Sequence, residues 1–127
     1  MDGGRPLGRA ERLEAILGRD GDRCVWCGTT FDGRLVVATT EHLVPRIKGG
    51  PSWIENEVAA CRRCNSDRGH VAPDRWLERC AELGWPADRE RVVTQLIALD
   101  AAIAERGGQR RARPYLASQL RRLRRPN

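Results

Sequence analysis

Aromatic residues are scarce in this chain of 127 residues, which holds four tryptophans, one tyrosine and one phenylalanine. So few large side chains leave little material for a hydrophobic core, and small cores of this kind are commonly reinforced by a metal ion or by disulfides. The length suits one domain rather than two. We therefore expect residues 1–127 to form a single domain with a small, reinforced core.

Long apolar runs are also missing. No stretch approaches the ~20 consecutive apolar residues of a membrane-spanning helix. Residues 9–17, the first helical stretch, carry charges throughout, whereas a secretion signal has an apolar run there. We expect a cytoplasmic protein without a membrane partner, in a compartment where thiols stay reduced.

Lysine is nearly absent, because Lys48 is the only lysine among 23 basic residues, yet the net charge is +6. Residues 101–127 hold eight arginines against one acid, Glu105, which gives this segment a balance of +7. Arginines without carboxylate partners attract phosphate backbones without reading bases. A solvated helix face in an arginine-rich sequence is the alternative. The candidate phosphate contacts of this tail are Arg121, Arg122, Arg124 and Arg125.

Four of the five cysteines form two Cys-x-x-Cys pairs, Cys24/Cys27 and Cys61/Cys64, and Cys80 stands alone. Among reduced thiols, such pairs indicate a metal site more often than disulfides. Two such turns supply four thiolates, the ligand set of a structural zinc ion with no open position for water. The alternative is that these cysteines are buried as small hydrophobic residues.

Apolar periodicity and the positions of glycine and proline predict a mixed α+β fold. The expected strands are 35–38, continued or paired in a hairpin by 39–44, and 57–60. The expected helices are 9–17, 65–68, 73–83, 87–105 and a last one from Pro114. The apolar stripe of helix 87–105 fits either the core of the domain or the seam of a homodimer. This stripe consists of Val92, Leu96, Leu99 and Ile103.

Between and after the cysteine pairs, a set of residues occurs in a defined order. The set is Glu41-His42-Leu43-Val44-Pro45, Gly49-Gly50, Asn56, Cys61-x-x-Cys64-Asn65 and Arg68-Gly69. Fourteen residues lead from His42 to Asn56 and nine from Asn56 to Asn65. This pattern resembles the HNH nuclease motif. The resemblance implies a zinc-stapled ββα-metal core at 24–70 with flanking α-helices, and a helical extension with a basic C-terminal segment at 73–125.

The chemistry of phosphodiester hydrolysis accounts for these residue types. A neutral imidazole at His42 can serve as the general base that activates the attacking water. A hard divalent ion such as Mg²⁺ or Mn²⁺ prefers oxygen ligands, so the carboxylate of Glu41 and the amide of Asn65 are its expected ligands. The resemblance implies that Asn56 is not a ligand but orients the loop that follows His42.

Two basic residues, Arg68 and His70, lie just past Asn65, where the HNH family often carries a basic residue facing the scissile phosphate. The resemblance makes both candidate phosphate contacts, and His70 is equally a candidate second base or surface residue. The family most often has aspartate or histidine before the general base, whereas here that residue is Glu41. Neighbouring strand residues point to opposite faces, so Glu41 and His42 are expected where a strand bends or ends.

The sequence therefore leads to the hypothesis of a bacterial or phage-encoded, metal-dependent endonuclease. DNA is the expected substrate, although the sequence does not decide between DNA and RNA, and the resemblance implies products with a 5′-phosphate and a 3′-hydroxyl. Two alternatives stand beside it. One is a catalytically weak or inactive zinc-bound nucleic-acid-binding module, which the departure at Glu41 favours. The other is a zinc domain for protein interaction without a nucleic-acid role.

Overall fold

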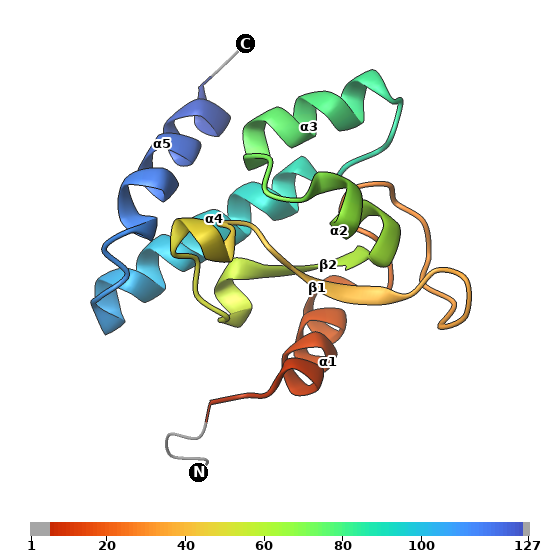
Figure 1. Ribbon diagram of the computed structural model, residues 1–127, viewed down its shortest axis with the longest axis horizontal. Helices are drawn as coiled ribbons and strands as arrows, with labels where there is room; N and C mark the ends of the chain where they lie inside the picture. Colours follow the sequence, from red (N-terminus) through yellow and green to blue (C-terminus); the bar gives the residue numbers. More distant parts are fainter. Residues whose placement is uncertain (1–5, 126–127) are drawn as a thin grey trace.

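The computed structural model describes residues 6–125, so both ends of the expected domain 1–127 lie outside the described residues. Five helices surround one small sheet, which gives the α+β fold expected from the sequence (Figure 1). The elements are α1 (Arg9–Asp20), β1 (Ala38–His42), η1 (Arg46–Lys48), η2 (Ile54–Asn56), β2 (Glu57–Cys61), α2 (Arg62–Arg68), α3 (Pro73–Glu82), α4 (Arg89–Arg106) and α5 (Ala112–Arg124). Within residues 6–125, none of these helices combines the length and the apolar character needed to cross a membrane.

The sheet consists of β1 and β2, which pair antiparallel from Ala38 opposite Cys61 to His42 opposite Glu57. His42 is the last residue of β1, so the prediction that Glu41 and His42 lie at a strand end is confirmed. The pairing also brings the second cysteine pair to the far end of the sheet from His42. The sheet thus joins the cysteine cluster to the candidate catalytic residues over five residue pairs.

The prediction of a strand at 35–38 is wrong for most of this segment, because β1 begins only at Ala38. The carboxylate of Asp32 accepts hydrogen bonds from the backbone N–H groups of Arg34, Leu35 and Val36 at 2.8–3.0 Å. These bonds close a turn in which the side chain of Leu35 is exposed. An aspartate that bonds to the following backbone competes with extended structure, and here it prevails over the β-branched residues.

The two faces of the sheet are covered by different helices. Figure 1 shows α1 on one side of the strands and α2 on the other. Arg9 of α1 donates from Nε to Oγ1 of Thr40 at 3.4 Å, and Asn65 of α2 donates from Nδ2 to Oγ1 of Thr39 at 2.9 Å. Because side chains alternate along a strand, His42 shares the α1 face with Thr40.

Helix α4 packs against α5, η2 and β2 and supplies much of the core. The whole apolar stripe is buried within this chain, namely Val92, Leu96, Leu99 and Ile103. A stripe that is already covered has no surface left to pair with a second copy. The homodimer seam considered for helix 87–105 is therefore not available, and the core alternative is the one the structure adopts.

The loop after β1 is held close to the strand by a backbone approach that only glycine permits. The N–H of Gly50 donates to the carbonyl of Pro45 at 3.0 Å. A Cβ atom on Gly50 would lie 1.8 Å from the carbonyl oxygen of Val44 and 2.9 Å from Nδ2 of Asn56. Gly50 thus sets how closely the loop folds back beside the candidate catalytic residues.

Substitution of this glycine should be costly. We expect Gly50→Ala to lower the free energy of unfolding by about 1–3 kcal/mol, because backbone atoms must move to admit the methyl group. Gly18 lies inside α1 with open space around its Cβ position, so Gly18→Ala should be neutral or stabilising by up to about 1 kcal/mol. Urea denaturation of both variants measures the difference, and equal effects would contradict this description of the loop.

Candidate active site

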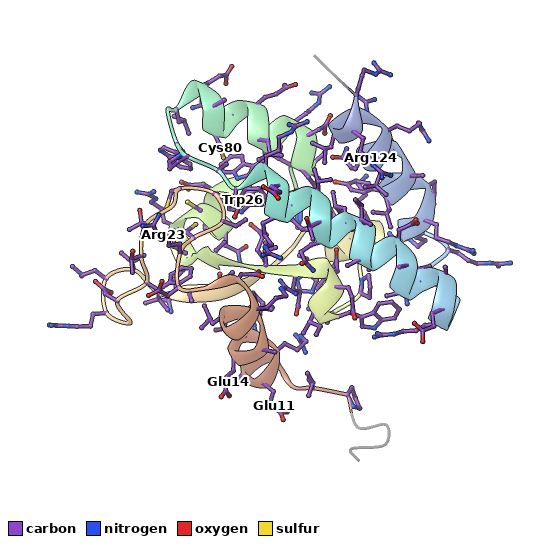
Figure 2. All side chains as sticks on the ribbon, turned by 180° about the vertical axis from the view of Figure 1, so that it is seen from behind. Glu11, Glu14, Arg23, Trp26, Cys80 and Arg124 are labelled. Atoms are coloured by element: carbon purple, nitrogen blue, oxygen red, sulfur yellow. The ribbon has the colours of Figure 1, made fainter. Side chains whose placement is uncertain are left out.

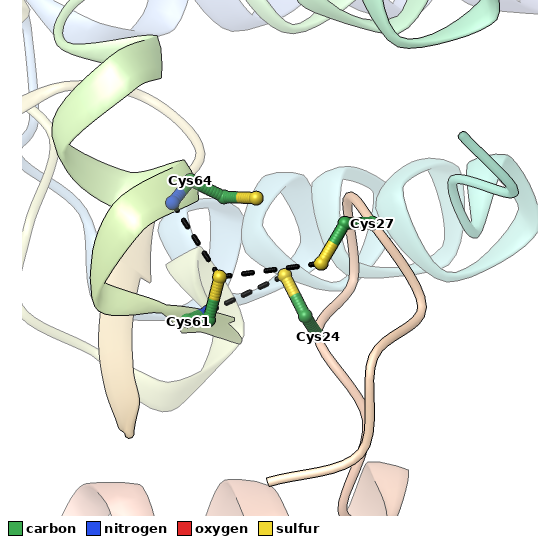
Figure 3. A group of neighbouring side chains, drawn as sticks. All are labelled: Cys24, Cys27, Cys61 and Cys64. Carbon is green, nitrogen blue, oxygen red and sulfur yellow. Dashed lines mark hydrogen bonds between the residues drawn. The ribbon is translucent and has the colours of Figure 1, made fainter. Parts of the chain in front are cut away.

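The four paired cysteines converge on one point, as Figure 3 shows. Their sulfur atoms all lie within 4.8 Å of one another, and the Sγ atoms of Cys27 and Cys61 are 4.0 Å apart. Zinc–sulfur bonds near 2.3 Å in a tetrahedron would place the sulfurs about 3.8 Å apart. The cluster therefore fits one zinc ion with four thiolate ligands. Cys80, in α3, is not part of it.

Two of these cysteines, Cys24 and Cys64, have pKa values shifted in opposite directions. A hydrogen bond from the thiol of Cys64 lowers the pKa of Cys24 to about 4, against the opposing effect of burial. The same hydrogen bond, together with burial, raises the pKa of Cys64. A backbone N–H also points at the cluster, since Cys61 donates to Sγ of Cys24 at 3.3 Å. The cluster thus favours negative charge on sulfur, which a cation would stabilise further.

The first cysteine turn also contacts Glu41. Trp26, between Cys24 and Cys27, donates from Nε1 to Oε2 of Glu41 at 2.9 Å. Arg68 places Nη1 3.1 Å from the other carboxylate oxygen, Oε1. The guanidinium of Arg68 also lies over the indole ring of Trp26, 5.6 Å from its centroid. Glu41 is thus fixed from both sides by the cysteine turn and by α2.

Arg68 was expected from the sequence to contact phosphate, but the structure buries it. Arg68 is only 1% exposed. Its guanidinium faces Glu41 and also donates to three backbone carbonyls at 2.7–2.8 Å. The carbonyls are those of His42, Leu43 and Val71. With all its donors directed inward, Arg68 ties α2 to the chain that follows β1.

Burial dominates the ionisation of Glu41. It raises the pKa of Glu41 to about 7, although the charge of Arg68 and the hydrogen bond from Trp26 act in the opposite direction. Each carboxylate oxygen has two acceptor positions, so one remains on each oxygen of Glu41. A cation bound there would favour the ionised form, and its binding would release protons at neutral pH.

Asn65 presents an amide oxygen that can bind a metal ion, and it lines the same pocket as Glu41. Its Nδ2 donates to Oγ1 of Thr39 at 2.9 Å and to the carbonyl of Thr40 at 3.1 Å. Both donors of the amide are thereby used, which leaves Oδ1 as the free acceptor. One carboxylate and one amide oxygen suit a hard divalent ion that keeps several waters, so this pair fits such a metal.

A pocket of about 260 Å³ opens at the end of β1. Its wall includes Glu41, His42 and Asn65, so the structure brings the expected general base and both expected metal ligands to one cavity. His70 also lines it and is exposed.

The imidazole of His42 is held neutral. Burial lowers the pKa of His42 to about 4, and the positive charges of Arg46, Arg12 and Arg9 act in the same direction. Nε2 lies 3.0 Å from Oγ of Ser52 and 3.2 Å from Oε2 of Glu57. The carboxylate does not reverse the pKa shift, so at pH 7 the neutral ring and Glu57 do not form an ion pair. A neutral ring is the form that a general base requires.

Asn56 is completely buried and ties the loop to the strand from within. Its Oδ1 accepts from the N–H of Val44 at 2.9 Å, and its Nδ2 donates to the carbonyls of Val44 and Pro51 at 3.1 and 3.0 Å. All three bonds span the chain between His42 and β2. This is the position of an orienting residue that is not itself a ligand.

The arginines beside the pocket differ from those expected. Arg9 from α1 and Arg46 from η1 line the pocket with exposed side chains, and within the described residues neither forms an ion pair. The tail arginines are exposed on the last turns of α5 and do not line this pocket. Figure 2 places Arg124 at the opposite end of the molecule from α1.

Sequence reasoning missed five residues around His42: Arg9, Arg12, Arg46, Ser52 and Glu57. Glu57 faces His42 only because of the register of β1 against β2, which no short motif records. Arg9 and Arg12 belong to a helix whose alternating charges resemble any solvated surface helix. The one available signal was the position of Glu57 directly before the apolar residues of the second strand.

Comparisons with known proteins agree with this geometry. A sequence model described as HNH endonuclease matches residues 24–80, which include the sheet, α2 and most of α3. Among solved structures, the chain is similar to the Type II-C Cas9 enzyme from Actinomyces naeslundii, with a TM-score of 0.54 and 23% identity. That match covers 99% of this chain and 12% of the Cas9 chain, and it concerns the fold. No curated protein matches the chain.

Loss of one thiolate should remove the metal and the fold together. We expect wild type to bind one zinc ion per chain and Cys24→Ser to lose it along with cooperative unfolding, because metal binding on the order of 10 kcal/mol contributes directly to folding. Elemental analysis and thermal denaturation measure both effects. Cys80→Ala is the matched control, since it removes a buried thiol outside the cluster and should keep the zinc. Full zinc content in Cys24→Ser would contradict the assignment.

The lowered pKa of His42 has a direct readout. In protein that keeps its zinc but has no divalent ion bound, its ring resonances should stay nearly constant from about pH 8 to about pH 5.5 and shift with a midpoint near pH 4, because a histidine with a depressed pKa stays neutral below the usual value of about 6.5. The chain has two histidines, so His70→Ala leaves one ring to follow by NMR. A midpoint at or above the usual value would refute the described burial of the ring.

Proposed function

We propose that this chain is a metal-dependent endonuclease of the HNH type that hydrolyses DNA phosphodiester bonds, in line with the HNH endonuclease model that matches residues 24–80. The observation that carries the proposal is that a neutral imidazole and two side chains with oxygen atoms able to bind a metal ion line one pocket. His42 comes from the end of β1, Glu41 from the opposite face of the same strand, and Asn65 from α2.

In the proposed reaction, His42 takes a proton from a water molecule, whose oxygen then attacks the phosphorus atom. Glu41 and Asn65 would hold a divalent ion, Mg²⁺ or Mn²⁺, which when bound neutralises negative charge on the phosphoryl oxygens. Asn56 keeps the loop after His42 in place through its three buried hydrogen bonds. The family resemblance implies products with a 5′-phosphate and a 3′-hydroxyl.

Glu41 is one methylene longer than the aspartate that the family often has at this position. Its contacts nevertheless support its role as a metal ligand. A longer side chain has more conformational freedom, but here Trp26 and Arg68 hold its two oxygens at 2.9 and 3.1 Å. The carboxylate is therefore positioned before any ion binds, and ordering it on binding costs little.

Substrate binding is assigned to two groups of positive charge. Arg9 and Arg46 border the pocket without acidic partners, so they suit the phosphates next to the scissile bond, with His70 beside them. The tail residues Arg121, Arg122, Arg124 and Arg125 form a separate exposed group that suits a more distant part of the strand. Both groups would contact the backbone and not the bases, which gives weak sequence preference.

One observation favours a second candidate, a zinc-bound nucleic-acid-binding module with little or no catalysis. Both oxygens of Glu41 already accept contacts from Arg68 and Trp26, and the residue is only 3% exposed. If Arg68 retains the carboxylate against a divalent ion, the chain binds DNA through its arginines and cleaves it poorly.

A plasmid-nicking assay with Mg²⁺ or Mn²⁺ separates these candidates. We expect wild type to nick DNA, and His42→Ala to reduce the rate by about 10²–10⁴-fold, the usual contribution of a general base. Asn65→Ala should require more metal. Arg79→Ala, an exposed α3 residue paired with Glu82, is the control and should keep full activity. Equal rates in wild type and His42→Ala, or none in either, would leave only the binding module.

The two groups of arginines should differ in their effect. Arg9→Ala combined with Arg46→Ala should reduce the slope of log binding constant against log salt by about 2, one for each phosphate contact, and should slow cleavage of bound DNA. Alanine substitution of the four tail arginines should weaken binding but leave cleavage of bound DNA unchanged. Fluorescence anisotropy across a salt series and single-turnover nicking measure both. An unchanged slope in the pocket variant would refute the assignment of Arg9 and Arg46.

A further inference from the structure

Glu57 is a completely buried acid that the proposed reaction does not use. It is the first residue of β2 and lies directly opposite His42 in the sheet. Its Oε1 accepts from Nε of Arg12 at 2.7 Å. Its Oε2 lies 3.2 Å from Nε2 of His42 and forms no hydrogen bond within the described residues. A buried carboxylate oxygen with a single neighbour that can donate indicates that this neighbour carries a proton.

We propose that Glu57 is a positioning residue for the general base: its Oε2 accepts the Nε2–H of His42, so that Nδ1 is the nitrogen that takes the proton from water. This inference rests on the proposed function. Neutral histidine carries its proton on one ring nitrogen only, and the partner of that nitrogen decides which. If Nε2 were unprotonated, its lone pair would face a carboxylate oxygen that has no proton to offer.

Ser52 is compatible with the same arrangement. Its Oγ lies 3.0 Å from Nε2 and can accept a share of the same N–H. Burial raises the pKa of Glu57, and the contact of Arg12 with the other carboxylate oxygen at 2.7 Å acts in the opposite direction, toward the ionised form. Because Arg12 belongs to α1, the helix outside the matched segment 24–80 contributes to the ionisation of Glu57 and through it to the state of the base.

The proton balance shows what Glu57 adds. Water loses one proton to Nδ1, its oxygen bonds to phosphorus, the bond from phosphorus to the leaving oxygen breaks, and that oxygen takes a proton from solvent. His42 is then an imidazolium among the guanidinium groups of Arg9, Arg12 and Arg46, which disfavour a further positive charge. Glu57 faces the Nε2–H of this cation and stabilises it until Nδ1 returns its proton to solvent.

Glu57→Gln should reverse the tautomer. The amide oxygen of the glutamine is expected to remain on Arg12, which only donates, so its NH₂ group turns toward His42. Nε2 must then accept, and the ring proton moves to Nδ1, where it blocks the base. The shape of the side chain is preserved, so the fold should persist.

The tautomer can be measured without activity, by the ¹⁵N shifts and couplings of the ring in protein that carries His70→Ala, keeps its zinc and has no divalent ion bound. Wild-type His42 should show the Nε2–H form, and Glu57→Gln should show the Nδ1–H form. An Nδ1–H ring in the otherwise wild-type protein would overturn the inference. Because this readout needs neither the divalent ion nor DNA, it stands or fails separately from the nuclease proposal.

Kinetics then test the role in the reaction. Glu57→Gln should lower kcat by about 10- to 100-fold with KM changed little, as expected when a residue that orients another is lost. In a His42→Ala background it should have no further effect, because its contribution passes through the imidazole. Glu55→Gln is the matched control, two residues away, where the carboxylate meets Arg106 at 3.3 Å. Equal losses with and without His42 would show a merely structural role and overturn the inference.

Discussion

The convergence of four cysteine thiolates is the constraint on which the rest of this structure depends. It joins the turn at 24–27 to the end of β2 and the start of α2, two segments that are far apart in the sequence. Trp26 lies inside the first turn and reaches Glu41, and Asn65 directly follows Cys64. The cysteine cluster therefore helps to position both candidate metal ligands. A change in the cluster would reach Glu41 through Trp26 and Asn65 through Cys64.

A second level of organisation is electrostatic. Two buried acids at the end of the sheet are each matched by one arginine, Glu41 by Arg68 from α2 and Glu57 by Arg12 from α1. Removing one partner of such a pair leaves an uncompensated buried charge, so each pair fixes its helix against the strand. Because each of these two arginines faces an acid, the remaining positive charge at the pocket comes from Arg9 and Arg46, which form no ion pair within residues 6–125. That arrangement attracts an anion while keeping His42 neutral.

Much of the framework was predictable because it depends on local chemistry. The expected helices at 9–17, 73–83 and 87–105 correspond to α1, α3 and α4, whose boundaries follow glycine, proline and apolar spacing. The strand expected at 35–38 failed because the carboxylate of Asp32 bonds to the backbone that follows it. Propensity scales describe the average behaviour of valine and leucine, and a single side-chain acceptor outweighed it here.

The sequence by itself determined the cysteine ligands, the identity of His42, Glu41, Asn56 and Asn65 as the residues of interest, and the strand end that carries the first pair. Only the tertiary structure decided which groups surround them. It buried Arg68 against Glu41, placed Glu57 opposite His42, and put Arg9 and Arg46, rather than the tail arginines, beside the pocket. The physical reason is that the spacing of ligands is a local property of the sequence, whereas strand register and helix docking depend on contacts between distant segments.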